Sequence, residues 1–273
     1  MRGTMPIVTT EVRTHKDRGR FARVRTWARR GSRNGRLALT NLFFPPRCLN
    51  CECELPEAAD HPLLCQKCLL AASSRKTSCV RCASPLPTVP WAGDSCPRCR
   101  GRDYSFDAAL AVGVYEDTMK QLVLRMKRAH HEPYALSLGT LVATKVLAAD
   151  LGEPPLIAPV PMHWARRFRR GGNHVERLAE RVAKRTRWKP AFDLLACRRR
   201  IKKQGTLTPA ARFRNVRGAF RVSSSYAIKG AHVLIIDDVL TTGATASEMA
   251  RLLKKAGAKK VTIAVVARGI GIQ

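Results

Sequence analysis

Two adjacent aspartates and a threonine-rich turn near the C-terminus carry the clearest chemistry in this 273-residue sequence. Asp237 and Asp238 follow the apolar run 233–236, and neighbouring carboxylates can accept hydrogen bonds from vicinal hydroxyls or hold a metal ion. The turn that follows opens a helical pattern, and N–H groups at a helix start, aided by threonine hydroxyls, suit a phosphate monoester. A ribose 5-phosphate moiety would satisfy both halves of this motif. The residues of the turn are Thr241, Thr242, Gly243, Ala244 and Thr245.

Cysteines provide a second kind of chemistry, because nine of the ten lie between residues 48 and 99 in a repeat of 31 residues. Each repeat holds two Cys-x-x-Cys pairs with 13 residues between them. Two such pairs provide four thiolates for one Zn²⁺, and a site closed by four sulfurs is structural. The predicted ligands are Cys48, Cys51, Cys65 and Cys68, called the first quartet, and Cys79, Cys82, Cys96 and Cys99, called the second quartet.

Alternatives for these cysteines remain open at the level of sequence. A disulfide framework is disfavoured because it rarely uses four Cys-x-x-Cys pairs and because the chain shows no secretory signal. Cys53 is either a spare thiol or a competitor for the first zinc, and Cys197 is more typical of a small buried residue than of a nucleophile. Basic residues near Trp91 suit either single-stranded nucleic acid or a solvated ribbon surface. These are Arg81, Arg98, Arg100 and Arg102.

Short apolar runs that alternate with helical patterns must position the aspartates and the turn. From about residue 107 onward, the runs 108–115, 155–161, 233–236 and 261–267 predict strands, with amphipathic helices between them. This alternation predicts an α/β fold with a mostly parallel sheet covered on both faces. Ligands of such sheets bind beyond the carboxyl ends of the strands, where Asp237 and Asp238 should lie. The following helix is expected to begin near Ala246.

The charge of the chain favours polyanionic partners. Lys and Arg number 50 against 20 Asp and Glu, for a formal net charge of +30, which suits nucleic acid, anionic lipid or phosphorylated metabolites. No apolar run approaches the roughly 20 residues that span a bilayer, so a membrane-spanning protein is excluded and a cytoplasmic one is expected. Residues 1–42 are rich in Arg and poor in acids, which predicts a disordered basic arm. That arm suits a solvated tail, a nucleic-acid contact or a transit peptide.

The pattern strand-Asp-Asp-x-x-Thr-Thr-Gly-x-Thr resembles the motif with which type I phosphoribosyltransferases bind 5-phosphoribosyl 1-pyrophosphate (PRPP). Three further segments resemble the ComF family of competence proteins, namely 120–133, 159–184 and 202–220. The resemblance covers about residues 43–269. It implies a type I phosphoribosyltransferase fold over 105–273, preceded by a double zinc ribbon over 43–104.

This resemblance also implies roles for individual residues. Asp237 and Asp238 would take the ribose hydroxyls as the catalytic pair, and residues 241–245 would take the 5-phosphate of PRPP, which binds together with Mg²⁺. Cations for the pyrophosphate and the mobile loop would be Arg166, Arg167, Arg170, Lys203 and Arg212. One residue departs from the family, because its usual glutamine after Gly-x-Asn is His174 here.

Two functions follow from the resemblance. The first is a PRPP-dependent transferase with an unidentified acceptor. The alternative is a non-catalytic adaptor that binds single-stranded DNA and works with a helicase, which the net charge and the lack of a recognisable nucleobase pocket favour. A homodimer is left open. A P-loop nucleotide hydrolase is disfavoured because the chain has no G-x-x-x-x-G-K-[ST] segment.

Overall fold

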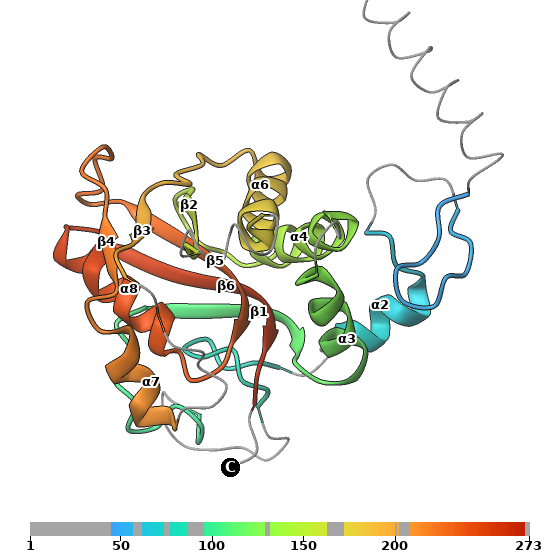
Figure 1. Cartoon of the computed structure of the whole chain (residues 1–273), viewed down its shortest axis with the longest axis horizontal. Coiled ribbons are helices and arrows are strands. Elements are labelled where there is room, and N and C mark those ends of the chain that lie inside the picture. The colour runs from blue at the N-terminus through green and yellow to red at the C-terminus, as the bar shows by residue number, and fades with distance from the viewer. Residues whose placement is uncertain are drawn as a thin grey trace, which may run out of the picture. The chain divides into compact units, whose positions relative to one another are not determined.

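The computed structural model of the chain describes residues 45–56, 62–73, 77–86, 96–128, 132–162, 172–199, 201 and 208–270 (Figure 1). The chain divides into two units, Met1–Pro46 and Arg47–Gln273, and the fold reported below belongs to the second. The predicted basic arm over residues 1–42 lies outside the described residues. So do four of the predicted pyrophosphate and loop cations, Arg166, Arg167, Arg170 and Lys203.

A four-stranded parallel sheet forms the centre of this second unit, in the order β1-β6-β5-β2. Its strands are β1 (Ala108–Val114), β2 (Leu156–Pro159), β5 (His232–Leu240) and β6 (Lys260–Arg268). The apolar, β-branched runs of β5 and β6 are buried on both faces, as expected for central strands of a parallel sheet. The prediction of an α/β fold with a parallel sheet is confirmed. A separate antiparallel pair joins β3 (Leu195–Cys197) to β4 (Phe220–Val222).

Strand β5 is longer than the sequence predicts. The apolar run ends at Ile236, but β5 continues to Leu240 because β6 still offers partners there, with Asp237 opposite Val265. On its other side, β2 stops at Pro159 opposite Ile236. The two aspartates therefore lie in a paired strand on one side and beyond the end of the neighbouring strand on the other.

Two hydrophobic cores cover the two faces of the sheet. In β5, Val233 and Ile235 belong to one core, whereas Leu234 and Ile236 belong to the other, because successive side chains of a strand point to opposite faces. The first core is covered by α7 and α8, and the second by α3, α4 and α6 (Figure 1). These helices are α3 (Asp117–Met126), α4 (Glu132–Leu147), α6 (His174–Thr186), α7 (Pro209–Val216) and α8 (Ala244–Lys255). None of the helices in the described ranges is long and apolar enough to cross a membrane.

The two cysteine quartets join different cores. The second quartet packs with the core under α7 and α8. Cys48 and Cys68 of the first quartet pack with the other core, together with the short helix α2 (Gln66–Ala72). Where α2 ends, the Ala72 carbonyl lies so close to Gly113 of β1 that an added Cβ would be 2.1 Å from it. Each ribbon is therefore packed against the main domain.

Candidate functional site

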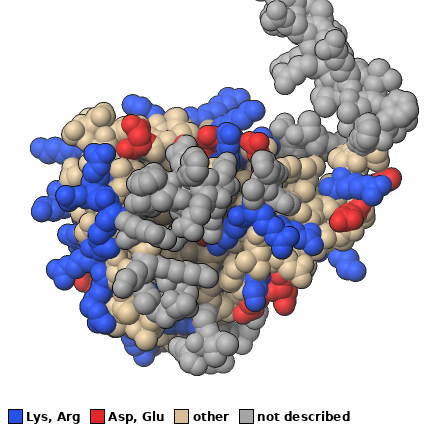
Figure 2. Space-filling model, in the orientation of Figure 1, with Lys and Arg blue, Asp and Glu red and all other residues tan. Residues whose placement is uncertain are grey.

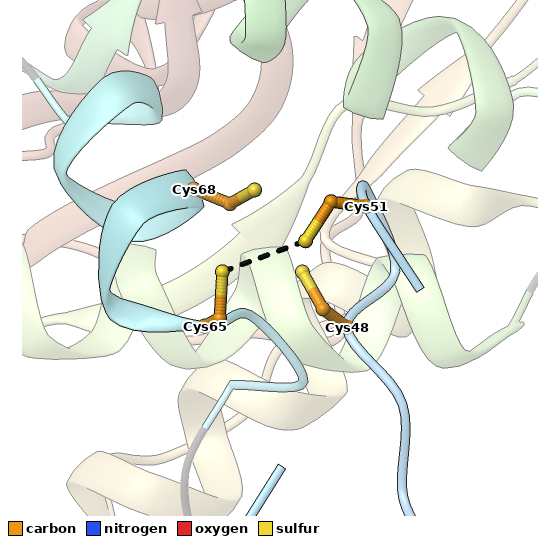
Figure 3. Close-up of side chains that lie close together, drawn as sticks. All are labelled: Cys48, Cys51, Cys65 and Cys68. Atoms are coloured by element: carbon orange, nitrogen blue, oxygen red, sulfur yellow. Dashed lines mark hydrogen bonds between the residues drawn. The ribbon is translucent and has the colours of Figure 1, made fainter. Parts of the chain in front are cut away.

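Both cysteine quartets have the geometry of a tetrahedral zinc site. Within each quartet, all four Sγ atoms lie within 4.8 Å of one another. Figure 3 shows the side chains of the first quartet pointing toward a common centre. Sulfur pairs are separated by 3.6 Å for Cys51–Cys65, 3.8 Å for Cys79–Cys99 and 3.5 Å for Cys82–Cys96. Zinc–sulfur bonds of about 2.3 Å in a tetrahedron require sulfur pairs about 3.8 Å apart, so both sets of thiols fit Zn²⁺. Cys53 belongs to neither group.

The first Cys-x-x-Cys turn of each ribbon, here called its knuckle, has the same backbone conformation in both ribbons. In the first, the N–H of Cys48 donates to the Cys53 carbonyl at 2.8 Å, and in the second, Cys79 donates to Ser84 at 2.9 Å. A residue in the left-handed region follows the second cysteine of each knuckle, Glu52 with φ 63° and Ala83 with φ 57°. These equivalent positions are 31 residues apart, so the sequence repeat is also a structural repeat.

At the carboxyl end of β5, Asp238 is the centre of a cluster of polar side chains. Its Oδ2 lies 2.7 Å from His174 Nε2 and 3.1 Å from Lys127 Nζ. Three elements bring these groups together, because Lys127 caps the end of α3 and His174 begins α6, where Asn173 is the N-cap. Asp237 accepts a hydrogen bond from the Asp238 N–H through Oδ1 at 2.8 Å.

The two aspartates have pKa values shifted in opposite directions. Burial and the charge of Asp238 raise the pKa of Asp237 to about 8, so this carboxyl holds a proton at neutral pH. Burial also acts to raise the pKa of Asp238, but the hydrogen bond from His174 and the charge of Lys127 outweigh it and lower the pKa to about 2. The pair thus offers one carboxylate and one carboxylic acid, which can accept and donate hydrogen bonds to two hydroxyls.

The predicted phosphate turn lies between β5 and α8, which begins at Ala244, two residues before the predicted start. Gly243 adopts φ 79°, and a Cβ added to it would lie 2.8 Å from Tyr104 Cε1. Glycine is therefore needed here both for the left-handed backbone and for the approach of the tyrosine ring. Tyr104 is itself stacked on Phe106, with ring centroids 4.7 Å apart.

The structure describes Asp237, Asp238 and residues 241–245 as one continuous segment, while the pyrophosphate and loop cations are represented only by Arg212 in α7. One neighbour of this segment was missed by the sequence interpretation. Arg268, at the end of β6, has its guanidinium within hydrogen-bond distance of the Leu240 and Thr241 carbonyls. The sequence signal that could have pointed to it is its position, because Arg268 is a single arginine directly after the strand-forming run 261–267.

The comparisons with known proteins agree with this architecture. Residues 160–271 match the family model of the phosphoribosyl transferase domain. A parallel sheet with adjacent aspartates near the carboxyl end of β5, followed by a turn into α8, has the organisation of a type I phosphoribosyltransferase domain, and cysteine clusters that fit a zinc ribbon precede it.

Curated relatives identify the family. The DNA utilization protein YhgH of Escherichia coli O6:H1 is 30% identical over 217 residues, covering 77% of this chain and 92% of that protein. Competence protein F of Haemophilus influenzae is 29% identical over 234 residues, covering 83% of this chain and 98% of that protein. The chain belongs to the ComF family. A phosphoribosylpyrophosphate synthetase structure from Mycobacterium smegmatis aligns over 48% of this chain and 33% of its own, with 20% identity and a TM-score of 0.31, too low to add weight.

Proposed function

We propose that this protein binds PRPP together with Mg²⁺ at the carboxyl end of β5. The 5-phosphate would bind the N–H groups and hydroxyls of residues 241–245, and the ribose hydroxyls would bind Asp237 and Asp238. The observation that carries the proposal is the cluster around Asp238. A carboxylate held by Lys127 and His174 stands three residues before a glycine-containing turn into a helix.

The cluster also suggests how the site accepts its ligand. Lys127 lies 3.1 Å from Asp238 Oδ2, neutralises its charge and holds the carboxylate in place. Ribose hydroxyls would replace Lys127 as the hydrogen-bond partners of Asp238. Lys127 is only partly exposed, and it would then be able to pair with an oxygen of the pyrophosphate. Asp237 would donate or release its proton according to whether it meets a hydroxyl or a metal ion.

Transfer of the phosphoribosyl group would use the same arrangement. The bond between C1 of the ribose and the pyrophosphate oxygen would break and its electron pair would leave with pyrophosphate. An electron pair of the acceptor would form the new bond to C1, and a proton on the acceptor atom would pass to pyrophosphate or water. Mg²⁺ would supply charge neutralisation on the departing pyrophosphate. The chain's own groups would hold the ribose and phosphate in place, which leaves C1 fixed for attack. The acceptor is not identified by any described residue.

Calorimetric titration tests the binding proposal. Mg²⁺-PRPP should bind the zinc-loaded protein saturably and more tightly than ribose 5-phosphate or pyrophosphate, because it contacts both parts of the site. The double variant Asp237→Asn, Asp238→Asn should abolish this binding while it keeps the zinc content of the protein. If the folded wild type binds PRPP no better than pyrophosphate alone, the proposal is wrong.

We also propose that the protein binds two zinc ions, one in each quartet. Elemental analysis should give about two zinc per chain after purification without chelator, since each quartet closes a four-sulfur shell. A value near one would mean that one quartet is not a zinc site.

Handling of single-stranded DNA, with a helicase as partner, is the second candidate function. It is favoured by the net charge of +30 and by the names of the relatives, one of which is a DNA utilization protein and another a competence protein. Lys and Arg are scattered over the face seen in Figure 2, most densely along one edge, and Asp and Glu appear there at fewer places. Fluorescence anisotropy with a labelled oligonucleotide should show affinity that falls steeply with salt. The double aspartate variant should retain that affinity, whereas its loss would mean that DNA and PRPP share one site.

A further inference from the structure

Arg268 is a buried arginine directly behind the segment proposed to hold the 5-phosphate. The residue is 5% exposed and stands at the last position of β6. Its Nη1 lies within hydrogen-bond distance of the Thr241 carbonyl, and it is 2.7 Å from the Leu240 carbonyl and 2.6 Å from the Gly269 carbonyl. Leu240 and Thr241 mark the junction between β5 and the turn, so one guanidinium fixes the point at which the turn begins.

The guanidinium is held by carbonyl oxygens rather than by an acid. Within the described part of the chain, no carboxylate makes an ion pair with Arg268. Arginine keeps its charge in proteins, and a buried charge without a counter-ion is unfavourable. A phosphate dianion bound on the 241–245 turn would add negative charge near this guanidinium. The buried cation therefore favours an anion at this turn.

The second ribbon holds the same arginine from the other side. Arg268 Nε donates to Ser84 Oγ at 3.1 Å, and Ser84 is fully buried in the knuckle of Cys79 and Cys82. Two further contacts join the segment after the second quartet to the turn and to α8. Tyr104 packs on Gly243, and the Ser105 N–H donates to Ser247 Oγ at 3.0 Å. The described part of the first ribbon instead contacts α3 and α4, where Arg125 Nη1 and Tyr134 Oη both donate to the Leu49 carbonyl.

We propose that Arg268 is a positioning residue for the 5-phosphate, and that it makes the second zinc ribbon the support on which the phosphate turn is held. This inference rests on the proposed PRPP site and deepens it. The second zinc would then act on ligand affinity through Ser84 and Arg268, at a distance from any ligand atom. The first zinc would stabilise the fold without this effect.

Three single variants test the proposal. Arg268→Gln removes the charge and most of the hydrogen bonds to the turn. Ser84→Ala removes only the link from the ribbon to Arg268. Arg125→Gln is the matched control, because Arg125 Nη1 donates to the Leu49 carbonyl of the first ribbon at 2.9 Å, which is also an arginine-to-carbonyl contact between a ribbon and the main domain.

Hydrogen exchange measures the positioning role without any ligand. Peptides that cover residues 241–249 should exchange faster in Arg268→Gln and in Ser84→Ala than in the wild type, while Arg125→Gln should leave them unchanged. Zinc content should stay at the wild-type value in all three proteins. If Arg268→Gln does not fold, Ser84→Ala decides alone. Wild-type exchange of these peptides in Ser84→Ala would overturn the support by the ribbon.

Calorimetry measures the consequence for the ligand. Affinity for Mg²⁺-PRPP and for ribose 5-phosphate should fall at least about tenfold in Arg268→Gln and about threefold in Ser84→Ala, as expected for lost hydrogen bonds to a charged group and to a neutral one. Pyrophosphate affinity should not change, which separates phosphate positioning from general damage. Arg268→Lys, which keeps the charge without the fork, should fall between Arg268→Gln and the wild type. An equal loss for all three ligands would overturn the proposal. If the wild type does not bind PRPP, the proposed function fails, and the exchange data still decide the role of Arg268 in holding the turn.

Discussion

Residue 53 of the first ribbon and residue 84 of the second occupy equivalent positions, but they differ in burial and in the contacts of their side chains. Each offers its carbonyl to the N–H of the first cysteine of its knuckle. Yet Cys53 is exposed, whereas Ser84 is fully buried and accepts a hydrogen bond from Arg268. The same local backbone, repeated after 31 residues, places an exposed side chain in the first ribbon and, in the second, a buried side chain that contacts Arg268 behind the proposed phosphate turn.

The quartets differ in burial in the same direction. All four cysteines of the second quartet are buried, whereas Cys51 of the first is exposed and Cys65 is half-buried. Zinc sites with the same four ligands can therefore serve different purposes. The residues around the ligands decide which other parts of the structure are perturbed when the metal is lost. We expect loss of the second zinc to reach the phosphate turn and loss of the first to remain more local.

Substitution of one cysteine in each quartet should give the largest contrast. Cys99→Ser should lower the Tm by roughly 10 °C or more, because a shift of about 2–4 °C per kcal/mol is typical for a domain of this size and the loss of a buried zinc ligand disrupts the core under α8. Cys51→Ser should lower the Tm by only about half as much, since Cys51 is exposed. Thermal unfolding monitored by calorimetry checks both variants. Equal losses of Tm would break the distinction between the ribbons.

Ligand binding should protect one zinc more than the other. If the second ribbon holds the phosphate turn, then by reciprocity a ligand on the turn must stabilise the second ribbon. Saturating Mg²⁺-PRPP should slow zinc release from the second quartet to a strong chelator, by at most about 100-fold at ligand concentrations 100 times the Kd. Release from the first quartet should not change.

The two releases can be told apart in the Cys51→Ser protein, which keeps only the second zinc. The double variant Asp237→Asn, Asp238→Asn is the control, because without PRPP binding the protection should vanish. Equal protection of both zinc ions in the wild type would mean that PRPP stabilises the whole unit and that the second ribbon has no special connection to the site.

A substitution in the ligand site itself should change stability without changing either ribbon. The raised pKa of Asp237, about 8, means that the folded protein favours the protonated carboxyl. This contribution to stability is complete below the unfolded pKa near 4 and is lost as pH rises through 8. Asn imitates the protonated form at every pH, so Asp237→Asn should gain stability over the wild type between about pH 4 and 8 and level off above.

Denaturant unfolding at several pH values would measure that gain, which should grow by at most about 1.4 kcal/mol per pH unit. Zinc content should stay unchanged, because Asp237 contacts neither quartet. A gain that is the same at pH 5 and pH 8 would show that Asp237 is ionised in the folded protein. Loss of zinc in this variant would instead reveal a connection from the aspartates to a ribbon.

Much of this architecture could be read from local sequence. The quartets were predictable because Cys-x-x-Cys spacing fixes the knuckle within four residues, and the parallel sheet was predictable because its strands are continuously apolar. The position of Asp237 and Asp238 near the carboxyl end of β5 was also predictable, because the pair follows the apolar run 233–236. What local patterns could not give were the contacts between distant segments. His174 and Asp238 are 64 residues apart, and Ser84 and Arg268 are 184 apart.

The predicted ends of two elements, β5 and α8, were wrong for a related reason. The predicted strand ended at the last apolar residue, Ile236, but the pairing of β5 with β6 extends it across both aspartates. Similarly, α8 begins at Ala244 because Gly243 supplies a left-handed residue that ends the turn, and that conformation is supported by the ring of Tyr104, far away in the sequence. The ends of β5 and α8 depend on contacts with residues distant in the sequence, and a single sequence does not show which distant residues are in contact.

The smallest expected effect concerns Cys53, and it completes the comparison of the two ribbons. Cys53 Sγ lies 3.5 Å from Cys51 Sγ but stands outside the tetrad, so Cys53→Ser should keep about two zinc per chain and change the Tm by no more than about 1–2 °C. A loss as large as that of Cys51→Ser would make Cys53 a ligand of the first zinc. The equivalent change in the second ribbon, Ser84→Cys, is the matched test. There a weak sulfur acceptor would replace the hydroxyl that Arg268 contacts, so the Tm and the affinity for ribose 5-phosphate should both fall further than in Cys53→Ser.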